Sequence, residues 1–471
     1  MYNSANQYRC TIIRGKSQKD IDNYLPAYAK IIGEICPCSK SDFEEQFNSR
    51  FRKMLPGTPT AKTLNNHRTE IAGKLFGMYY AEVAGYDNEV YIYPGERTMK
   101  FLEDQDQPAF FKDVCYKMQF PNGMTKSETV IERVEKGISI RPCCFVIEVL
   151  CEAKRRNLQL TKNDIGYYVL NSLDALTRQA SPFEIVDAIQ VDRMSGVTSH
   201  EIGDPTKESS YNVQHINEQI NYMELANLII VDDDGMVLLN EKEEQTIQVF
   251  ASHWDDDPLF DVRAYDMSTV QARQFFQTEW DSYYSALSAD ANMFRTSVSA
   301  LVPEGATSPS GGDQTSSGQD TTELGDEGER YVYEYEKKRV ASFNARLVNK
   351  VLSLGKTKGL GYDIQTVLAI PGDQAEFVKY IEVKATKRVT APDINDSLWI
   401  DTLNLTRNEW VAAQQHGQFY AIYRVYFVRG SVLMYVIENP YQLFESGTIT
   451  VVPTMYKLDF SNSAVDRVIS N

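Results

Sequence analysis

The stretch YIEVKAT, residues 380–386, combines a strand-like alternation with two charged side chains two positions apart. In an extended strand Ile381 and Val383 point to one face, whereas Glu382 and Lys384 point to the other. One interpretation is a solvated charge pair on the outer face of a sheet. The alternative is the carboxylate and lysine of a metal-dependent nuclease, in which a divalent ion activates water for attack on a phosphodiester.

A second carboxylate lies upstream, in the strand-like stretch GLGYDIQTVLAI, residues 359–370. A Pro-Gly-Asp turn at 371–373 follows it and leads back to YIEVKAT. A hairpin of this length brings Asp363 beside Glu382. The two strands are therefore expected to present two carboxylates and one lysine together.

Two carboxylates at this place suit Mg²⁺, which prefers carboxylate oxygens and retains several waters. We expect Asp363, Glu382 and the backbone carbonyl of Val383 to hold Mg²⁺, for which Mn²⁺ is a substitute. Lys384 is expected to position the attacking water and to stabilise developing charge. Basic residues flank the strands where phosphate contacts are expected: Lys356, Lys358, Lys387 and Arg388.

The spacing Glu-x-Lys alone carries little weight, because residues 152–154 and 336–338 repeat it in stretches typical of helices. The flanking elements add to it. The stretch 328–354 has the apolar spacing of a long helix. The stretch 405–428 opens with a capping box from Thr406 to Glu409 and is predicted to run from helix into strand.

Four segments in this order resemble the C-terminal domain of the plant protein NO VEIN, which is similar to the PD-(D/E)xK nuclease superfamily. They are GDEGERYVYEYEKKRV, GLGYDI, YIEVKAT and LTRNEWVAAQQHG with FYAIYRVYFV, within residues 325–440. The resemblance implies metal-binding roles for Asp363 and Glu382 and a catalytic role for Lys384. It also implies a supporting acidic role for Glu329.

The segments depart from the superfamily name in one position, since Tyr362 precedes Asp363 where the name has proline. Glu409 has an ordinary explanation as a helix cap, so we leave it outside the catalytic set.

The first 300 residues are predicted to form mainly helical units with β-wings. A helix over 64–83 is followed by strand runs over 89–103, with a turn at Pro94-Gly95, and a helix with a hairpin recurs over 212–243. A cluster of polar residues begins the first presumed recognition helix and forms a candidate DNA-reading set: Asn65, Asn66, His67 and Arg68. The second wing turn is rich in aspartate, which favours a structural or protein-binding role.

This region resembles, more weakly, the recognition regions of FokI-like and AlwI-like type IIS restriction enzymes. The matching stretches are LNNHRTEIAGKLFG with its wing, FFKDVCYKMQFPNG, and ISIRPCCFVIEVL leading to LTKND. The resemblance implies tandem winged-helix-like units that read an asymmetric DNA sequence, and a tethered nuclease that cuts outside it.

A segment of Gly, Ser, Thr, Asp, Gln and Pro, residues 303–324, separates the two regions and lacks the apolar content to fold. We therefore expect a multidomain protein: mainly α with winged-helix-like units in front, and an α/β PD-(D/E)xK core behind. The expected divisions are a recognition domain at 1–140, a second helical domain at 141–296, a flexible linker at 297–324 and a nuclease domain at 325–471.

The net charge of −17 and the pI of about 4.9 argue against indiscriminate binding of nucleic acid or anionic membranes. No secretory signal or membrane span is predicted, and the seven cysteines, all before residue 152, are interpreted as reduced structural thiols of a cytoplasmic protein.

The leading hypothesis is a Mg²⁺-dependent, site-specific DNA endonuclease of the type IIS restriction kind. Its expected partners are double-stranded DNA, a second copy bound transiently through the nuclease domain, and a cognate DNA methyltransferase. Two alternatives stay open: a modification-dependent or phage-defence nuclease acting with partner proteins, and a non-catalytic DNA- or protein-binding scaffold with a degenerate nuclease fold.

Overall fold

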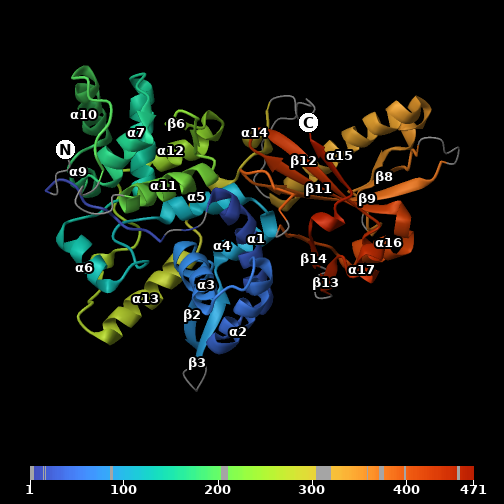
Figure 1. Cartoon of the computed structure of the whole chain (residues 1–471), viewed down its shortest axis with the longest axis horizontal. Helices are drawn as coiled ribbons and strands as arrows, with labels where there is room; N and C mark the ends of the chain where they lie inside the picture. The colour runs from blue at the N-terminus through green and yellow to red at the C-terminus, as the bar shows by residue number, and fades with distance from the viewer. Residues whose placement is uncertain are drawn as a thin grey trace.

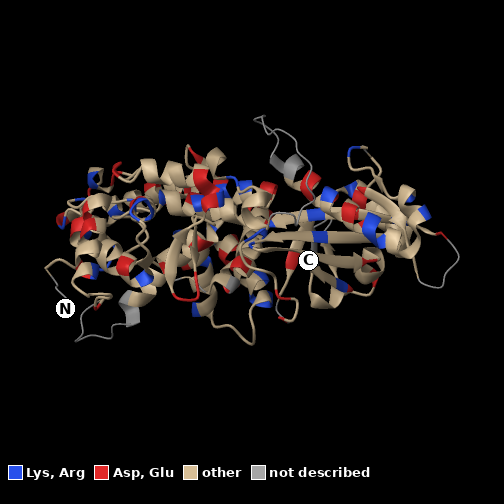
Figure 2. Cartoon of the chain, turned by 90° about the horizontal axis from the view of Figure 1, so that it is seen from above, with Lys and Arg blue, Asp and Glu red and all other residues tan. Residues whose placement is uncertain are grey.

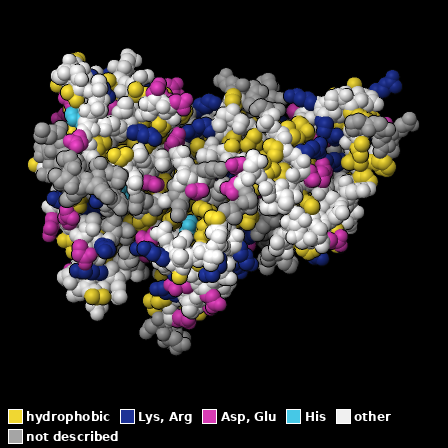
Figure 3. Space-filling view, viewed as in Figure 1, with side chains coloured by type: hydrophobic (Ala, Val, Ile, Leu, Met, Phe, Trp, Pro, Cys, Tyr) yellow, Lys and Arg dark blue, Asp and Glu magenta, His cyan; other side chains and the backbone are white. Residues whose placement is uncertain are grey.

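The computed structural model describes residues 5–13, 15, 17–84, 89–202, 210–303, 320–357, 359–370, 376–396, 399–452 and 457–470. A mainly helical N-terminal part lies beside a C-terminal part built on a large mixed sheet (Figure 1). Acidic and basic residues are interspersed along both parts (Figure 2). Apolar side chains reach the surface in several places, including the C-terminal part (Figure 3).

The first N-terminal unit consists of three helical segments and a three-stranded sheet in the order β1-β3-β2. Its elements are α1 (Gln18–Ile35), β1 (Cys38–Ser39), α2 (Lys40–Phe51), α3 (Ala61–Asn65), the π-helical continuation η2 (Asn66–Leu75), β2 (Tyr79–Ala84) and β3 (Glu89–Pro94). The predicted helix followed by a hairpin is present, but the expected strand pair over 89–103 is wrong. The hairpin is β2 with β3, and Gly95 instead begins helix α4 (Glu96–Asp104).

A second unit repeats this order of elements, and its sheet has the equivalent order β4-β6-β5. It contains α7 (Pro142–Arg155), β4 (Leu160–Thr161), α8 (Lys162–Asp164) continuing into η3 (Ile165–Leu170), α11 (Ser210–Leu225), β5 (Ile229–Val231) and β6 (Met236–Leu239). Thr161 and Asp164 form a complete capping box at the start of α8. The predicted aspartate-rich turn joins β5 to β6.

One apolar core joins the two units, so the expected division at residue 140 runs through shared packing. The core includes Ile32 of the first unit, Phe111 of the intervening α5 (Gln107–Lys117), and Ile220 of the second. Further helices surround it: α6 (Ser127–Glu135), α9 (Leu173–Leu176), α10 (Pro182–Met194), α12 (Glu244–Ser252) and α13 (Val270–Ser285).

The C-terminal part is a six-stranded sheet, ordered β15-β12-β11-β9-β8-β7, between two apolar layers. The strands are β7 (Leu352–Ser353), β8 (Ile364–Val367), β9 (Val378–Lys387), β11 (Tyr420–Val428), β12 (Ser431–Glu438) and β15 (Arg467–Ser470). Only β9 and β11 among these paired strands run parallel. Their crossover passes through α16 (Arg407–His416). In the strand order β9 lies inside the sheet, between β11 and β8.

Helix α15 (Asp320–Asn344) covers one face of the sheet, where Val332 and Val340 pack against Ile381 and Val383. The other face is covered by α16, α17 (Pro440–Glu445) and a small sheet of β10 (Asp401–Asn404), β13 (Thr450–Val452) and β14 (Lys457–Phe460). Both faces of β9 are therefore covered. Glu382 is 2% exposed and the Lys384 side chain is 22% exposed, so the pair does not lie on an open outer face of the sheet.

The expected linker is shorter than its composition suggests. Helix α14 (Val298–Leu301) places Val298 and Leu301 in the core of the C-terminal part, and α15 already begins at Asp320. Residues 304–319 of the predicted linker lie outside the described residues. All seven cysteines are free thiols, as expected. No helix in the described part of the chain is both long and apolar enough to cross a membrane.

Candidate active site

Asp363 lies where strands β8 and β9 separate. Its backbone N–H donates to the Ile381 carbonyl at 2.9 Å, which is a normal ladder bond. The next donor on β9, the Val383 N–H, binds the Asp363 carboxylate at Oδ2, 2.8 Å away. Because a side chain replaces the backbone partner, β8 turns away from β9 and leaves the Asp363 carboxylate beside the middle of β9.

The loop that delivers Asp363 is held tightly. Gly361 has a φ of +77°, and an added Cβ there would lie 2.5 Å from the Asn408 carbonyl oxygen of α16, so glycine is required. Tyr420 of β11 donates its hydroxyl to the Gly361 carbonyl at 2.9 Å. Gly361 therefore forms a fixed bend against α16.

Lys384 lies between two carboxylates. Its Nζ is 2.6 Å from Glu382 Oε1 and 3.0 Å from Glu409 Oε2. Glu409 also closes the capping box of α16, because its Oε2 accepts the Thr406 N–H at 2.8 Å. The sequence predicted the cap but not the contact between Glu409 and Lys384. The missed signal was that a helix crossing between parallel strands sets its N-terminus against the sheet.

Glu329 approaches the site from helix α15. Its carboxylate lies against Gly355, where any larger residue would overlap it. Burial, with the nearby charges of Asp363 and Asp326, raises the pKa of Glu329 to about 7. The four predicted site residues on three elements therefore lie within electrostatic reach of one another: Glu329, Asp363, Glu382 and Lys384.

Burial dominates the electrostatics of this site. Glu382 is only 2% exposed, and burial raises its pKa well above the ordinary value, with Lys384 opposing and Asp363 adding to the effect. Burial also raises the pKa of Asp363, partly offset by the Val383 N–H. Burial lowers the pKa of Lys384, but the carboxylates of Glu382 and Glu409 outweigh it and raise that pKa overall. The site thus holds a cationic lysine beside two carboxylates, Asp363 and Glu382, whose pKa values are raised by burial.

The donor set suits a hard divalent cation. In the described ranges, no three His, Cys, Asp or Glu side chains lie close enough together to form a metal cage. Mg²⁺ needs less, because it is bound through one or two carboxylates and keeps several waters. Buried carboxylates with raised pKa values, as at Asp363 and Glu382, are stabilised in their charged form by a nearby cation. The residues present therefore fit Mg²⁺, with the Val383 carbonyl as the third expected oxygen.

Comparison with known proteins identifies the family of the N-terminal part. The profile of the family described as restriction endonuclease BpuJI, N terminal, matches residues 2–281. The chain belongs to this family. The profile of the C-terminal domain of protein NO VEIN matches residues 328–437. Both resemblances drawn from the sequence, to a restriction-enzyme recognition region and to the NO VEIN domain, are confirmed.

A solved structure supports the same assignment. It is described as the BpuJ1 endonuclease binding domain in complex with pyrene- and phenanthrene-modified DNA. It is 48% identical in sequence, with a TM-score of 0.56, and the match covers 60% of this chain and 100% of that one. A comparison with curated proteins found no match.

Two of the predicted DNA contacts in the BpuJI-type region are wrong, because their side chains belong to the core. His67 is 1% exposed and hydrogen bonds to the Tyr28 hydroxyl at 2.5 Å. Arg68 is buried and donates to Asn48 Oδ1 and Asn65 Oδ1, both at 2.9 Å. Successive helical residues point about 100° apart, so four consecutive side chains cannot all face the same side. Only Asn65 and Asn66 remain at the surface.

The basic residues expected to flank the strands differ in their exposure to solvent. Lys356 is exposed near Glu329, and Lys358 lies outside the described residues. Lys387 and Arg388 are each 4% exposed, so their predicted role as phosphate contacts is wrong in this arrangement. Both contact the BpuJI-type part: Lys387 lies 3.3 Å from Asp106, and Arg388 donates to Asn23 Oδ1 at 3.0 Å.

Proposed function

We propose that the protein is a Mg²⁺-dependent, site-specific DNA endonuclease with a type IIS-like organisation. The observation that carries this proposal is the convergence of Asp363, Glu382 and Lys384 at the separation of β8 and β9. This constellation stands in the same chain as a BpuJI-type recognition region. The geometry supports a PD-(D/E)xK core, in which these residue types serve phosphodiester hydrolysis.

The N-terminal part is proposed to read double-stranded DNA with two winged-helix units. In each unit a helical segment directly precedes a hairpin, and the third strand pairs in the same position of the sheet. This arrangement suits a helix that enters the major groove and a hairpin beside it. The DNA-bound binding domain that is 48% identical supports the same substrate class.

In the proposed reaction, Asp363 and Glu382 would hold Mg²⁺, which would supply charge neutralisation at the phosphate and activation of water. Lys384, kept cationic by Glu382 and Glu409, donates hydrogen bonds that orient the attacking water and stabilise the developing charge. Glu329, with a pKa of about 7, is suited to accept the proton that the water loses. Helix α16 fixes Lys384 through Glu409.

One such site cuts one strand, so double-strand cleavage requires two C-terminal parts to meet on DNA. We propose a transient homodimer for this step, with the cut outside the recognition sequence. A cognate methyltransferase is the proposed partner that protects host DNA from such an enzyme.

The direct experiment incubates the full chain with methylated and unmethylated plasmid in Mg²⁺ and sequences the ends. Ends at a fixed offset from one asymmetric sequence support the proposal. Cleavage only of methylated plasmid indicates a modification-dependent nuclease, and sequence-specific binding without any ends indicates a scaffold.

A further inference from the structure

Three aromatic rings lie together beside the candidate active site. The Tyr380 ring stacks on the His416 ring, with centroids 3.9 Å apart and planes at 27°. The Tyr362 ring lies 4.7 Å from the Tyr380 ring and 6.0 Å from the His416 ring. All three side chains are partly exposed. These three residues, named the ring cluster below, therefore keep a surface that the protein does not cover.

A second stacked pair extends this surface. Phe377 stacks on Phe419 of η8 (Gly417–Phe419), with centroids 5.6 Å apart, and Phe377 is 48% exposed. Phe377 lies three positions before Tyr380, and Phe419 lies three positions after His416. The aromatic surface thus follows the contact between the start of β9 and the end of α16, which lie side by side in Figure 1. Clustered apolar side chains at a surface are typical of binding sites.

The strands that carry the catalytic residues also carry the rings. Tyr362 directly precedes Asp363. Tyr380 lies two positions before Glu382 on the same face of β9, and Lys384 lies two positions after it. Two strand residues span ~7 Å, which is roughly two nucleotides at ~3.4 Å each. A phosphate at Glu382 would therefore have the ring cluster within about two nucleotides along the strand.

Helix α16 connects the ring cluster with the active site. Its first turn provides Glu409, which binds Lys384 at 3.0 Å, and its last residue is His416. Burial lowers the pKa of His416, so the ring is uncharged near neutral pH. An uncharged ring does not attract phosphate as a cation does, and what it offers a nucleic acid is its flat face.

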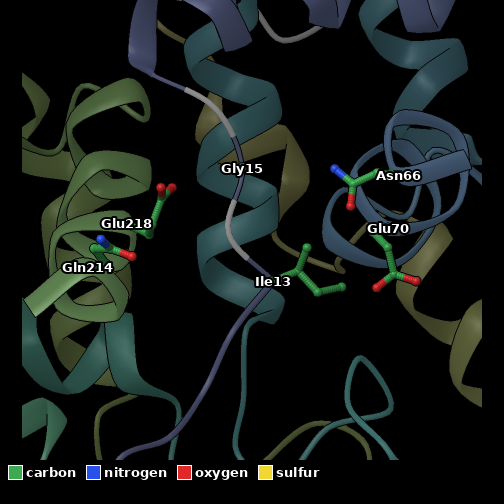
Figure 4. A pocket seen from close by; sticks show the side chains of 6 residues that line it. All are labelled: Ile13, Gly15, Asn66, Glu70, Gln214 and Glu218. Carbon is green, nitrogen blue, oxygen red and sulfur yellow. The ribbon is translucent and has the colours of Figure 1, made fainter. Parts of the chain in front are cut away.

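Flat faces suit an enzyme that cuts outside the sequence it recognises. Every base has a face on which an aromatic ring can stack, so stacking tolerates any sequence. The cavity of about 540 Å³ between the two N-terminal units has a different chemistry. Its lining offers hydrogen-bonding side chains and no ring (Figure 4): Ile13, Gly15, Asn66, Glu70, Gln214 and Glu218. At an offset cut site the bases vary, and a grip through stacking remains effective there.

We propose that the ring cluster stacks on a base of the strand being cut, within about two nucleotides of the scissile phosphate. A base in a duplex is already stacked on both sides, so it must leave the stack before the rings can hold it. Stacking on the rings offsets part of this cost and fixes the backbone at the site. This inference rests on the proposed function, because it presupposes that Asp363 and Glu382 serve cleavage of DNA.

Photo-crosslinking tests the contact without any cleavage. The full chain is bound in Ca²⁺ to duplexes that carry the recognised sequence and a single 5-iodouracil, moved one position at a time across the cut site. On irradiation this base bonds preferentially to aromatic side chains that stack on it. We expect crosslinks to Tyr362, Tyr380 or His416 from one or two positions of the cut strand. Crosslinks that avoid all three residues, or no crosslinks near the cut, would overturn the proposal.

Cleavage in Mg²⁺ tests whether ring and base act together. Tyr380→Leu should slow cleavage of the intact duplex by roughly tenfold to a hundredfold, and so should removal of the stacked base from the DNA. The two changes combined should slow it no further. A mismatch at that base should speed cleavage by the unchanged protein, because unpairing is already complete. Tyr380→Phe, which keeps a ring, should retain the rate.

The control is Tyr333→Leu on α15, which packs on the other face of the sheet and should cut as the unchanged protein does. Tyr380→Leu must bind the recognised sequence with unchanged affinity, and Tyr362→Leu replaces it if it does not fold. Equal slowing of intact and base-free duplexes by the leucine variant would show a structural role and overturn the proposal. Failure of the unchanged protein to cut any duplex would instead contradict the proposed function.

Discussion

Lys387 Nζ lies 3.3 Å from Asp106 Oδ2, and both side chains are almost completely buried between the two parts of the chain. Lys387 is the last residue of β9, three positions after Lys384. Its backbone N–H also donates to the Gln105 carbonyl at 3.1 Å. The strand that carries the candidate active site is thus anchored directly on the recognition region.

This anchoring predicts the effect of Lys387→Met. Removing one member of a buried ion pair costs about 3 kcal/mol or more when the other charge is left alone. Asp106 keeps two N–H donors, from Ala109 at 3.0 Å and Thr296 at 2.9 Å. The loss in unfolding free energy should therefore be about 3 kcal/mol. Urea unfolding measures it. The exposed Lys356→Met serves as the control, and an equal loss in both variants would contradict the anchoring.

Glu409 is predicted to position Lys384 in addition to capping α16. Glu409→Gln should lower the cleavage rate strongly, because Lys384 loses one of its two anionic partners. Thr406→Ala is the matched control, since it removes the other half of the capping box and leaves the Lys384 contact in place. Thr406→Ala should lose about 1 kcal/mol of stability, whereas Glu409→Gln should lose little from the cap, because glutamine at this position also closes a capping box. Equal cleavage rates in the two variants would leave Glu409 with the cap alone.

The raised pKa of Glu329 predicts a pH dependence of stability. Between its ordinary value of 4.5 and about 7, the folded chain keeps a proton that the unfolded chain has released. Stability from this group is therefore lost as the pH rises through that range and is level above it. Glu329→Gln removes the effect, so its Tm relative to the unchanged protein should be higher at pH 8 than at pH 5. A Tm difference independent of pH would contradict the shift.

The place of cleavage follows from the connection between the parts. A flexible linker of the 22 residues expected from composition would span ~25–28 Å, which is roughly eight base pairs at ~3.4 Å per pair. Helix α15 already begins at Asp320 and Lys387 holds β9 on Asp106, so the cut should fall on one side of the recognised sequence and within this distance. The rate per enzyme should rise with enzyme concentration, because two nuclease sites must meet. Cleavage inside a palindrome at a concentration-independent rate would indicate a stable symmetric dimer instead.

Local signals in the sequence predicted much of the structure. The capping box of Thr406 and Glu409 and the aspartate-rich turn were both predicted, because each depends on residues a few positions apart. One local signal misled: Pro94-Gly95 has the composition of a hairpin turn, yet Gly95 is the N-cap of α4.

Long-range contacts account for the remaining differences. Lys387 was expected at a DNA-facing surface, and its actual partner lies 281 positions away in the chain. His67 was expected to face DNA, but Tyr24, Tyr28 and Phe51 enclose its ring.

The active-site assignment predicts that Asp363→Ala and Lys384→Ala abolish cleavage and leave DNA binding nearly intact. The matched control for the lysine is Lys154→Ala, in the helical Glu-x-Lys motif of α7, where the side chain is exposed. Glu336, in the third such motif, is unsuited as a control because it is fully buried and binds Arg339 and the Tyr423 hydroxyl, so its loss would weaken the fold.

The most direct measurement compares the full chain and its Glu382→Ala variant on a duplex that carries the recognised sequence. Cleavage is recorded in Mg²⁺ and binding in Ca²⁺, on the same preparations. We predict that the full chain cuts at a fixed offset from the recognised sequence, whereas the variant binds with nearly unchanged affinity and does not cut. Cleavage by Glu382→Ala at the rate of the unchanged protein would contradict the assignment of the nuclease site.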